Sequence, residues 1–129
     1  MARTVLIADD IPFVRKTLAK ILADAHYQVV GEAETGQQAV EMYAKLRPEI
    51  TMMDVVMPIM SGIEAVRRIT KMDKEAKIIM ISAMDQETVI MEAINAGAKD
   101  YLIKPFTAND ILKTLEHLYA EKGGKRATG

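Results

Sequence analysis

Short apolar stretches alternate with segments of helical periodicity along this chain. Five stretches read as buried strands, at residues 4–8, 28–32, 50–53, 77–81 and 101–103. After each of them, apolar positions recur every three or four residues, which is the spacing of an amphipathic helix. This alternation predicts a single α/β domain in which five helices cover both faces of a five-stranded parallel sheet. The second strand contains Gly31 and is short, so its prediction rests mostly on the alternation.

Residues that favour helix ends indicate where the helices begin and stop. The five predicted starts lie at or near Pro12, Thr35, Ser61, Asp85 and Thr107. Gln38 and Glu64 follow Thr35 and Ser61 at the spacing of a capping box. The second helix must end before Pro48, and Gly97 can end the fourth in a left-handed conformation. We expect Ala44 and Ile94 to point into the core from the second and fourth helices.

Composition narrows the class of protein. The chain has 129 residues, half of them apolar, which is enough for one domain with a real core. No stretch has the roughly 20 apolar residues that a membrane span needs, and a cytoplasmic protein is expected. A formal net charge of −1 disfavours direct nucleic-acid binding. With no cysteine and only two separated histidines, any metal must be held by oxygen ligands.

Polar side chains stand at the carboxyl ends of four predicted strands. They are Asp9 and Asp10 after the first strand, Asp54 after the third, Ser82 after the fourth and Lys104 after the fifth. In an open parallel sheet these ends line one edge, where ligands bind. We therefore expect three carboxylates, one hydroxyl and one ammonium to converge on a single site.

Three clustered carboxylates repel one another unless a cation compensates them. Mg²⁺ is the natural candidate, because it combines one or two carboxylates with water and a phosphate oxygen, whereas Ca²⁺ demands more oxygens than this edge supplies. In that interpretation Lys104 neutralises phosphoryl oxygens and Ser82 donates a hydrogen bond to another. The plainer alternatives are that Asp9 and Asp10 cap the first helix and that Lys104 is solvated. The Lys104-Pro105 bond is a candidate for the cis isomer.

In combination these motifs resemble a bacterial response regulator receiver domain, most closely the free-standing chemotaxis-regulator type. The resemblance covers roughly residues 3–119. Its motifs are Val5-Leu6-Ile7-Ala8-Asp9-Asp10, Met53-Asp54-Val55-Val56-Met57-Pro58 with Gly62, Ile81-Ser82-Ala83, Gly97-Ala98 and Lys104-Pro105-Phe106. The resemblance implies a flavodoxin-like, doubly wound fold with strand order 2-1-3-4-5, an order known for the chemotaxis regulator itself and adopted here by similarity.

The resemblance also implies roles for individual residues. Asp54 would be the phosphoacceptor, and Mg²⁺ would be bound directly by Asp10, Asp54 and the backbone carbonyl of Val56, with Asp9 acting through water. Lys104 would bind the phosphoryl group. Ser82 and Tyr101 would form a switch pair, in which the hydroxyl moves toward the phosphoryl group and the ring turns inward. The plainer alternative for Tyr101 is an aromatic side chain that only packs on the fourth helix.

Two apolar residues stand where related sites often carry polar ones. Val56 is two residues after Asp54, and Met84 is two residues after Ser82. Neither can easily orient a water for attack on an acyl phosphate, so we expect a long-lived phosphorylated state.

The resemblance places an output surface on the fourth helix, the fifth strand and the fifth helix. We expect that surface to include Glu87, Met91, Asn95, Lys99 and Tyr101. Met91 would be an adaptable contact there, although a methionine at helical spacing is more often a core residue.

The leading hypothesis is a signalling switch that takes a phosphoryl group from a sensor histidine kinase or a phosphotransfer domain. It would control a protein such as the flagellar motor switch, act as a monomer, and catalyse nothing beyond its own phosphorylation and dephosphorylation. A receiver excised from a multidomain transcriptional regulator is the first alternative; the start at Met1 and the short tail favour the free-standing form. An aspartyl-phosphate hydrolase would need an acid/base Asp where Val56 stands and a cap. A flavin carrier would need phosphate donors in the first loop.

We expect residues 1–122 to form the receiver domain. Residues 123–129 are polar and glycine-rich without periodicity, so this tail is expected to be disordered. His26 and His117 fit loop and helix-surface positions, and neither is expected to donate phosphate.

Overall fold

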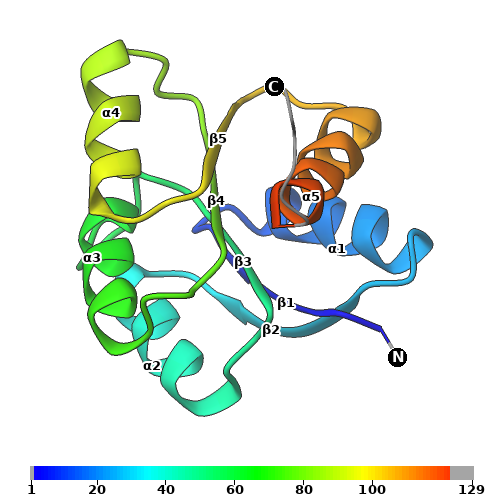
Figure 1. Cartoon of the computed structure of the whole chain (residues 1–129), viewed down its shortest axis with the longest axis horizontal. Helices are drawn as coiled ribbons and strands as arrows, with labels where there is room; N and C mark the ends of the chain where they lie inside the picture. Colours follow the sequence, from blue (N-terminus) through cyan, green and yellow to red (C-terminus); the bar gives the residue numbers. More distant parts are fainter. Residues whose placement is uncertain (1, 123–129) are drawn as a thin grey trace.

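The computed structural model describes residues 2–122, and the tail at 123–129 lies outside the described residues. Strands and helices alternate strictly along the chain (Figure 1). In chain order they are β1 (Thr4–Ala8), α1 (Pro12–Asp24), β2 (Gln28–Ala33), α2 (Gly36–Leu46), β3 (Ile50–Met53), α3 (Gly62–Met72), β4 (Ile78–Ser82), α4 (Glu87–Ala96), β5 (Asp100–Ile103) and α5 (Ala108–Lys122). All five predicted strands are confirmed, including the second.

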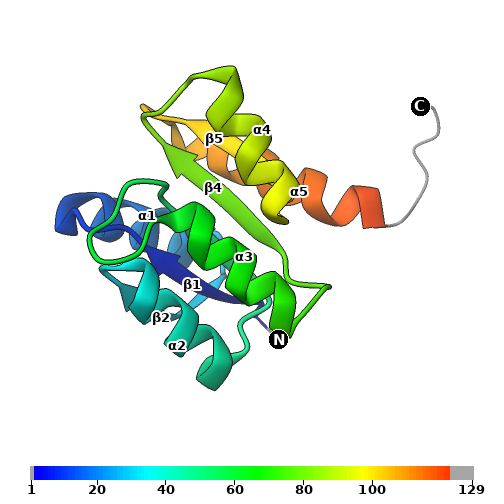
Figure 2. The ribbon, with the colours of Figure 1, turned by 90° about the vertical axis from the view of Figure 1, so that its left-hand side faces the viewer.

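The five strands form one parallel sheet in the order β2-β1-β3-β4-β5, as the resemblance implied. Helices α1 and α5 cover one face, and α2, α3 and α4 cover the other (Figures 1 and 2). The neighbouring strands β1 and β3 lead into helices on opposite faces, α1 and α3, so the loops at the carboxyl ends of these two strands diverge and open a crevice between them.

Local side-chain chemistry sets most helix starts. Thr35 and Ser61 accept hydrogen bonds from the backbone nitrogens of Gln38 and Glu64, at 3.0 and 3.2 Å. At α5 the reciprocal capping box forms: Asp110 N donates to Thr107 Oγ1 and Thr107 N donates to Asp110 Oδ2. These contacts confirm the predicted starts of α2, α3 and α5.

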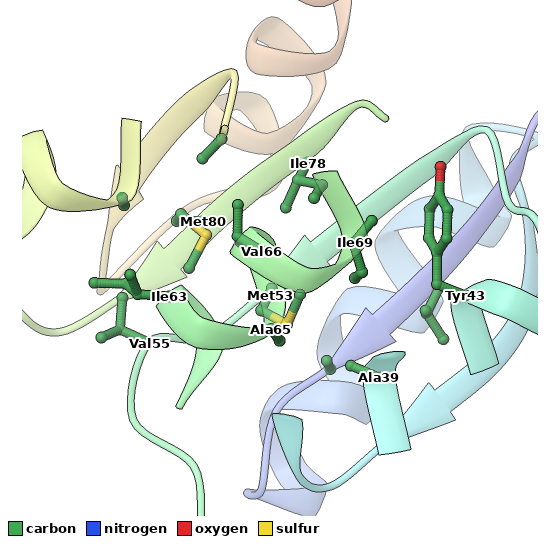
Figure 3. Packing of buried hydrophobic residues seen from close by; sticks show 14 of the residues in the cluster. Ala39, Tyr43, Met53, Val55, Ile63, Ala65, Val66, Ile69, Ile78 and Met80 are labelled. Atoms are coloured by element: carbon green, nitrogen blue, oxygen red, sulfur yellow. The ribbon is translucent and has the colours of Figure 1, made fainter. Parts of the chain in front are cut away.

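Two apolar clusters hold the helices to the sheet. One lies under α2, α3 and α4, where α3 contributes Ile63, Val66 and Ile69 (Figure 3). The other lies under α1 and α5 and includes Leu18, Leu22, Ile111 and Leu115. Because both faces are covered, β1, β3 and β4 are almost continuously apolar and their backbones are firmly anchored.

Two predicted inward positions were wrong. Ala44 is exposed, whereas Ala39 and Tyr43 of the same helix are buried (Figure 3). Ile94 is 38% exposed, because α4 lies at the edge of the sheet beside β5 and fully buries only Ala93. Gly97 ends α4 with φ 130°, as predicted, in a conformation that side chains other than glycine's rarely allow.

Candidate functional site

The carboxyl ends of four strands bring the predicted polar residues together. Asp9 follows β1, Asp54 follows β3, Ser82 ends β4 and Lys104 follows β5. Backbone hydrogen bonds continue the sheet into these ends: Asp54 N donates to Ala8 O at 2.9 Å, and Lys104 N donates to Ser82 O at 2.9 Å. The strand register thus places side chains that are distant in sequence around one crevice.

The three aspartates form a compact acidic cluster. Carboxylate oxygens of Asp9, Asp10 and Asp54 lie within 4.8 Å of one another. Asp9 and Asp54 are buried, at 2% and 6% exposure, whereas Asp10 faces solvent. This donor set consists of oxygen atoms, carries excess negative charge and has one open side, so it fits a hydrated divalent cation such as Mg²⁺.

Lys104 lies between the two buried carboxylates. Its Nζ is 3.0 Å from Asp9 Oδ2 and 3.3 Å from Asp54 Oδ2. Burial alone lowers the pKa of Lys104, but the hydrogen bond to Asp9 and the charge of Asp54 outweigh it and raise the pKa overall. Lys104 is therefore a cation in the site and not a solvated surface lysine. The Lys104-Pro105 bond is cis.

Asp54 remains electrostatically strained despite this contact. Burial raises its pKa above the ordinary value; Lys104 opposes the rise and the Asp9 carboxylate adds to it. Asp54 Oδ1 accepts a hydrogen bond from Val55 N at 2.7 Å, which orients the carboxylate. A buried, oriented carboxylate whose charge is undercompensated favours binding of a further cation.

The two predicted switch residues contact the same peptide segment. Ser82 Oγ accepts a hydrogen bond from Met84 N at 3.2 Å, and the Tyr101 hydroxyl donates one to Met84 O at 2.6 Å. Tyr101 is half-buried and packs against the cluster under α4. The loop after β4 thus links Ser82 to Tyr101 through the backbone of Met84.

Val56 and Met84, the two apolar residues found where related sites often carry polar ones, differ in their surroundings. Val56 is 57% exposed beside Asp54. Met84 is half-buried and packs against the cluster under α4. A substitution at Val56 therefore changes the site's rim, whereas one at Met84 also disturbs packing.

Three of the predicted output residues, Glu87, Met91 and Asn95, line one hollow on α4. Arg67 of α3 lines the same hollow, so the hollow opens toward α3. Tyr101 and Ile103 share one face of β5, and Ile103 is 42% exposed.

One residue that contacts the site was missed from the sequence. Arg15 of α1 donates a hydrogen bond from Nη1 to the backbone carbonyl of Asp9 at 2.7 Å. Nothing in its local sequence separates it from a solvent-facing arginine, because its partners come from the preceding loop and from β2.

Comparison with known proteins agrees with this geometry. Residues 5–116 match the family model of the response regulator receiver domain. The chemotaxis protein CheY of Thermotoga maritima is 48% identical over 115 residues, covering 89% of this chain and 96% of that protein. CheY of Bacillus subtilis is 45% identical with the same coverage. The transcriptional regulatory protein PdtaR of Mycobacterium tuberculosis is 40% identical over 88% of this chain but only 55% of its own length.

Solved structures give the same relationship. A chain in the crystal structure of the CheX-CheY-BeF3-Mg²⁺ complex from Borrelia burgdorferi superposes with a TM-score of 0.89 at 31% identity, covering 91% of this chain and 89% of that one. A CheY-like receiver domain protein of Methanospirillum hungatei gives a TM-score of 0.87 at 26% identity, with coverage of 96% and 100%.

Proposed function

This chain belongs to the response regulator receiver domain family, whose CheY-like members are signalling proteins, and we propose that it is a phosphorylation-controlled switch in chemotaxis. It accepts a phosphoryl group on Asp54 from a sensor histidine kinase or a phosphotransfer domain. It then controls a partner protein through the surface around α4, β5 and α5. We place it in the cytoplasm and expect it to act as a monomer.

One observation carries this proposal: Asp54 is a buried, oriented carboxylate with an ammonium 3.3 Å away and two further carboxylates beside it. A carboxylate oxygen of Asp54 would attack the phosphorus of a phosphohistidine. The new P–O bond forms as the P–N bond breaks, and the imidazole leaves with the electron pair and takes up a proton from solvent. Hydrolysis later returns Asp54 and releases inorganic phosphate.

Receiver domains bind Mg²⁺ at an acidic pocket of this kind, and the donor set here fits that ion. Asp10, Asp54 and the backbone carbonyl of Val56 would hold it directly, and Asp9 through water. When bound, the ion supplies charge neutralisation for phosphoryl oxygens.

Within residues 2–122, no helix is long and apolar enough to cross a membrane.

Lys104 and Ser82 would serve the other phosphoryl oxygens. Lys104 already lies between Asp9 and Asp54, so a small movement toward a phosphoryl oxygen keeps its charge compensated. The Ser82 hydroxyl accepts from Met84 N and retains its own hydrogen for donation. That movement would alter the Met84 segment, which Tyr101 also contacts, and so couple the site to the surface of β5.

The downstream partner is proposed from the relatives. Similarity to several chemotaxis proteins favours a component such as the flagellar motor switch, and the relative crystallised with CheX offers a second type of partner. The PdtaR match favours one alternative, a receiver module of a larger transcriptional regulator. Retention of the beryllofluoride-activated chain by an immobilised motor-switch protein would support the first and contradict the second.

Phosphotransfer in solution tests the proposal. A purified sensor histidine kinase, autophosphorylated with isotope-labelled ATP and freed of nucleotide, is mixed with the full chain. We expect the label to reach the chain in Mg²⁺ and not in EDTA. The Asp54→Asn variant should stay unlabelled, whereas the surface control Asp24→Asn should be labelled like the wild type. Labelling of Asp54→Asn, or labelling that survives EDTA, would contradict the proposal.

A further inference from the structure

The guanidinium of Arg15 joins three segments beside the acidic cluster. Nη1 donates to the Asp9 carbonyl at 2.7 Å, Nε donates to Glu32 Oε1 at 3.1 Å, and Nη2 lies 3.6 Å from Glu34 Oε2. The Arg15 side chain is only 12% exposed. This arginine is therefore turned toward the loop after β1 and the end of β2, and away from bulk solvent.

These contacts fix the backbone between the first two aspartates. Asp9 N donates to Ala33 O at 3.0 Å, and Asp9 Oδ1 accepts from Ile11 N at 2.9 Å. The Asp9 carbonyl belongs to the same planar peptide group as the nitrogen of Asp10. By holding that carbonyl, Arg15 sets the orientation of the peptide from which Asp10 projects.

Asp10 depends on this backbone support more than its neighbours do. Asp54 is oriented by Val55 N and Lys104, and Asp9 by Ile11 N and Lys104. Among residues 2–122, the exposed Asp10 carboxylate has no hydrogen-bond partner of its own. We propose that Arg15 is a positioning residue, which holds the Asp9-Asp10 peptide so that the Asp10 carboxylate is preorganised for Mg²⁺. This inference rests on the proposed Mg²⁺ site.

The positioning role and simple electrostatics predict opposite effects. A cation near a metal site repels the metal, so deleting Arg15 would strengthen Mg²⁺ binding if charge alone mattered. Glu32 and Glu34 already compensate the positive charge of the guanidinium. Its main effect on Mg²⁺ binding should therefore come from the hydrogen bond that orients the Asp9-Asp10 peptide. Lysine keeps the charge but has one nitrogen, which cannot serve the Asp9 carbonyl and Glu32 in the same planar arrangement.

Mg²⁺ titration of the full chain tests the inference, with binding heat as the readout at a temperature well below unfolding. For Arg15→Lys and Arg15→Met we expect the dissociation constant for Mg²⁺ to rise about tenfold, as for other residues that orient a metal ligand. Glu32→Gln, which removes one anchor of the guanidinium, should raise it less. Arg68→Lys is the matched control, because Arg68 pairs with Glu64 on the surface of α3.

A second readout separates positioning from general damage. Labelling by acetyl phosphate should need more Mg²⁺ in Arg15→Lys but reach the wild-type rate at saturating Mg²⁺. Unchanged or tighter Mg²⁺ binding in Arg15→Lys would overturn the inference, and so would a binding loss of the same size in Arg68→Lys. Should Arg15→Met fail to fold, Arg15→Lys decides the matter, because it keeps the charge and removes only the planar arrangement. If the wild type itself bound no Mg²⁺, the proposed function would fail, and not only the role of Arg15.

Discussion

Lys104 Nζ lies 3.3 Å from Asp54 Oδ2, although the two residues are 50 positions apart in the chain. The same nitrogen lies 3.0 Å from Asp9 Oδ2. One ammonium thus serves two buried carboxylates that would otherwise repel each other. This arrangement ties the stability of the fold to the residues proposed to bind the phosphoryl group.

Replacing Lys104 with Met keeps much of the side chain's bulk but removes the charge. Because Asp9 and Asp54 are then left buried without a cation, we expect the free energy of unfolding to fall by about 3 kcal/mol in Mg²⁺-free buffer at neutral pH. Urea denaturation measures the loss. Lys20→Met is the control, because Lys20 pairs with Asp24 in solvent and should change stability by about 0.5 kcal/mol or less. Equal losses in the two variants would contradict the prediction.

The difference in stability between Asp54→Asn and the wild type should depend on pH. Since burial raises the pKa of Asp54 above 3.8, the folded chain keeps a proton there after the unfolded chain has lost it. Asp54 therefore lowers the free energy of unfolding as pH rises from 3.8 through the raised pKa. Without Mg²⁺, the free energy of unfolding of Asp54→Asn should exceed that of the wild type at pH 7 by about 1 kcal/mol, because the variant buries a neutral amide in place of a charge.

The advantage of Asp54→Asn should disappear as pH falls below 3.8, where Asp54 is protonated in both states. Thermal unfolding across a pH series measures this difference, with Asp24→Asn as a surface control. Added Mg²⁺ should stabilise the wild type more than Asp54→Asn. If Asp54→Asn were less stable than the wild type at pH 7 without Mg²⁺, the buried charge of Asp54 would not be destabilising, and the prediction would be wrong.

Position 62 has no room for a side chain, because the backbone of Asp54 passes directly beside it. A Cβ at position 62 would lie 1.8 Å from the carbonyl oxygen of Asp54, so Gly62→Ala must displace the loop. We expect a loss of about 3 kcal/mol in the free energy of unfolding and a large fall in phosphorylation rate. Gly31→Ala is the matched control, because its Cβ would meet side-chain ends and no backbone: Leu46 Cδ1 at 2.9 Å, Leu6 Cδ1 at 3.3 Å and Met42 Sδ at 3.5 Å. Equal stability losses at both positions would refute this reading.

Val56 should control the lifetime of the phosphorylated state. It is exposed beside Asp54, so Val56→Asn adds a group that can hold a water near the acyl phosphate without disturbing the core. We expect phospho-Asp54 to decay about tenfold faster, less than the ~10²-fold of a true general base. Phosphate release after removal of the donor measures the decay. Val56→Thr, similar in shape to valine, should decay at a rate closer to the wild type, and unchanged or slower decay in Val56→Asn would show the expectation to be wrong.

The sheet and the convergence of Asp9, Asp54, Ser82 and Lys104 could be predicted from the sequence for one physical reason. A parallel sheet buried on both faces leaves a clear pattern of apolar runs, and the residues that follow those runs must meet at one edge. The order of the strands could not be derived in this way and came from the resemblance. Long-range pairing leaves no local mark on the chain.

The errors and omissions have the same origin. Ile94 has helical spacing with Ile90, yet it is partly exposed because α4 covers only the edge of the sheet. The role of Arg15 depends on an acceptor six residues earlier and on a carboxylate in β2, a combination that only the folded structure brings together.

The most direct measurement is to locate the phosphoryl group itself. The full chain is incubated with acetyl phosphate and Mg²⁺, reduced with borohydride to convert any aspartyl phosphate to homoserine, digested and mapped by mass spectrometry. The account predicts a single conversion, at Asp54, that disappears when Mg²⁺ is chelated. Conversion at Asp9, Asp10 or another carboxylate of the wild-type chain, or none in the presence of Mg²⁺, would contradict it.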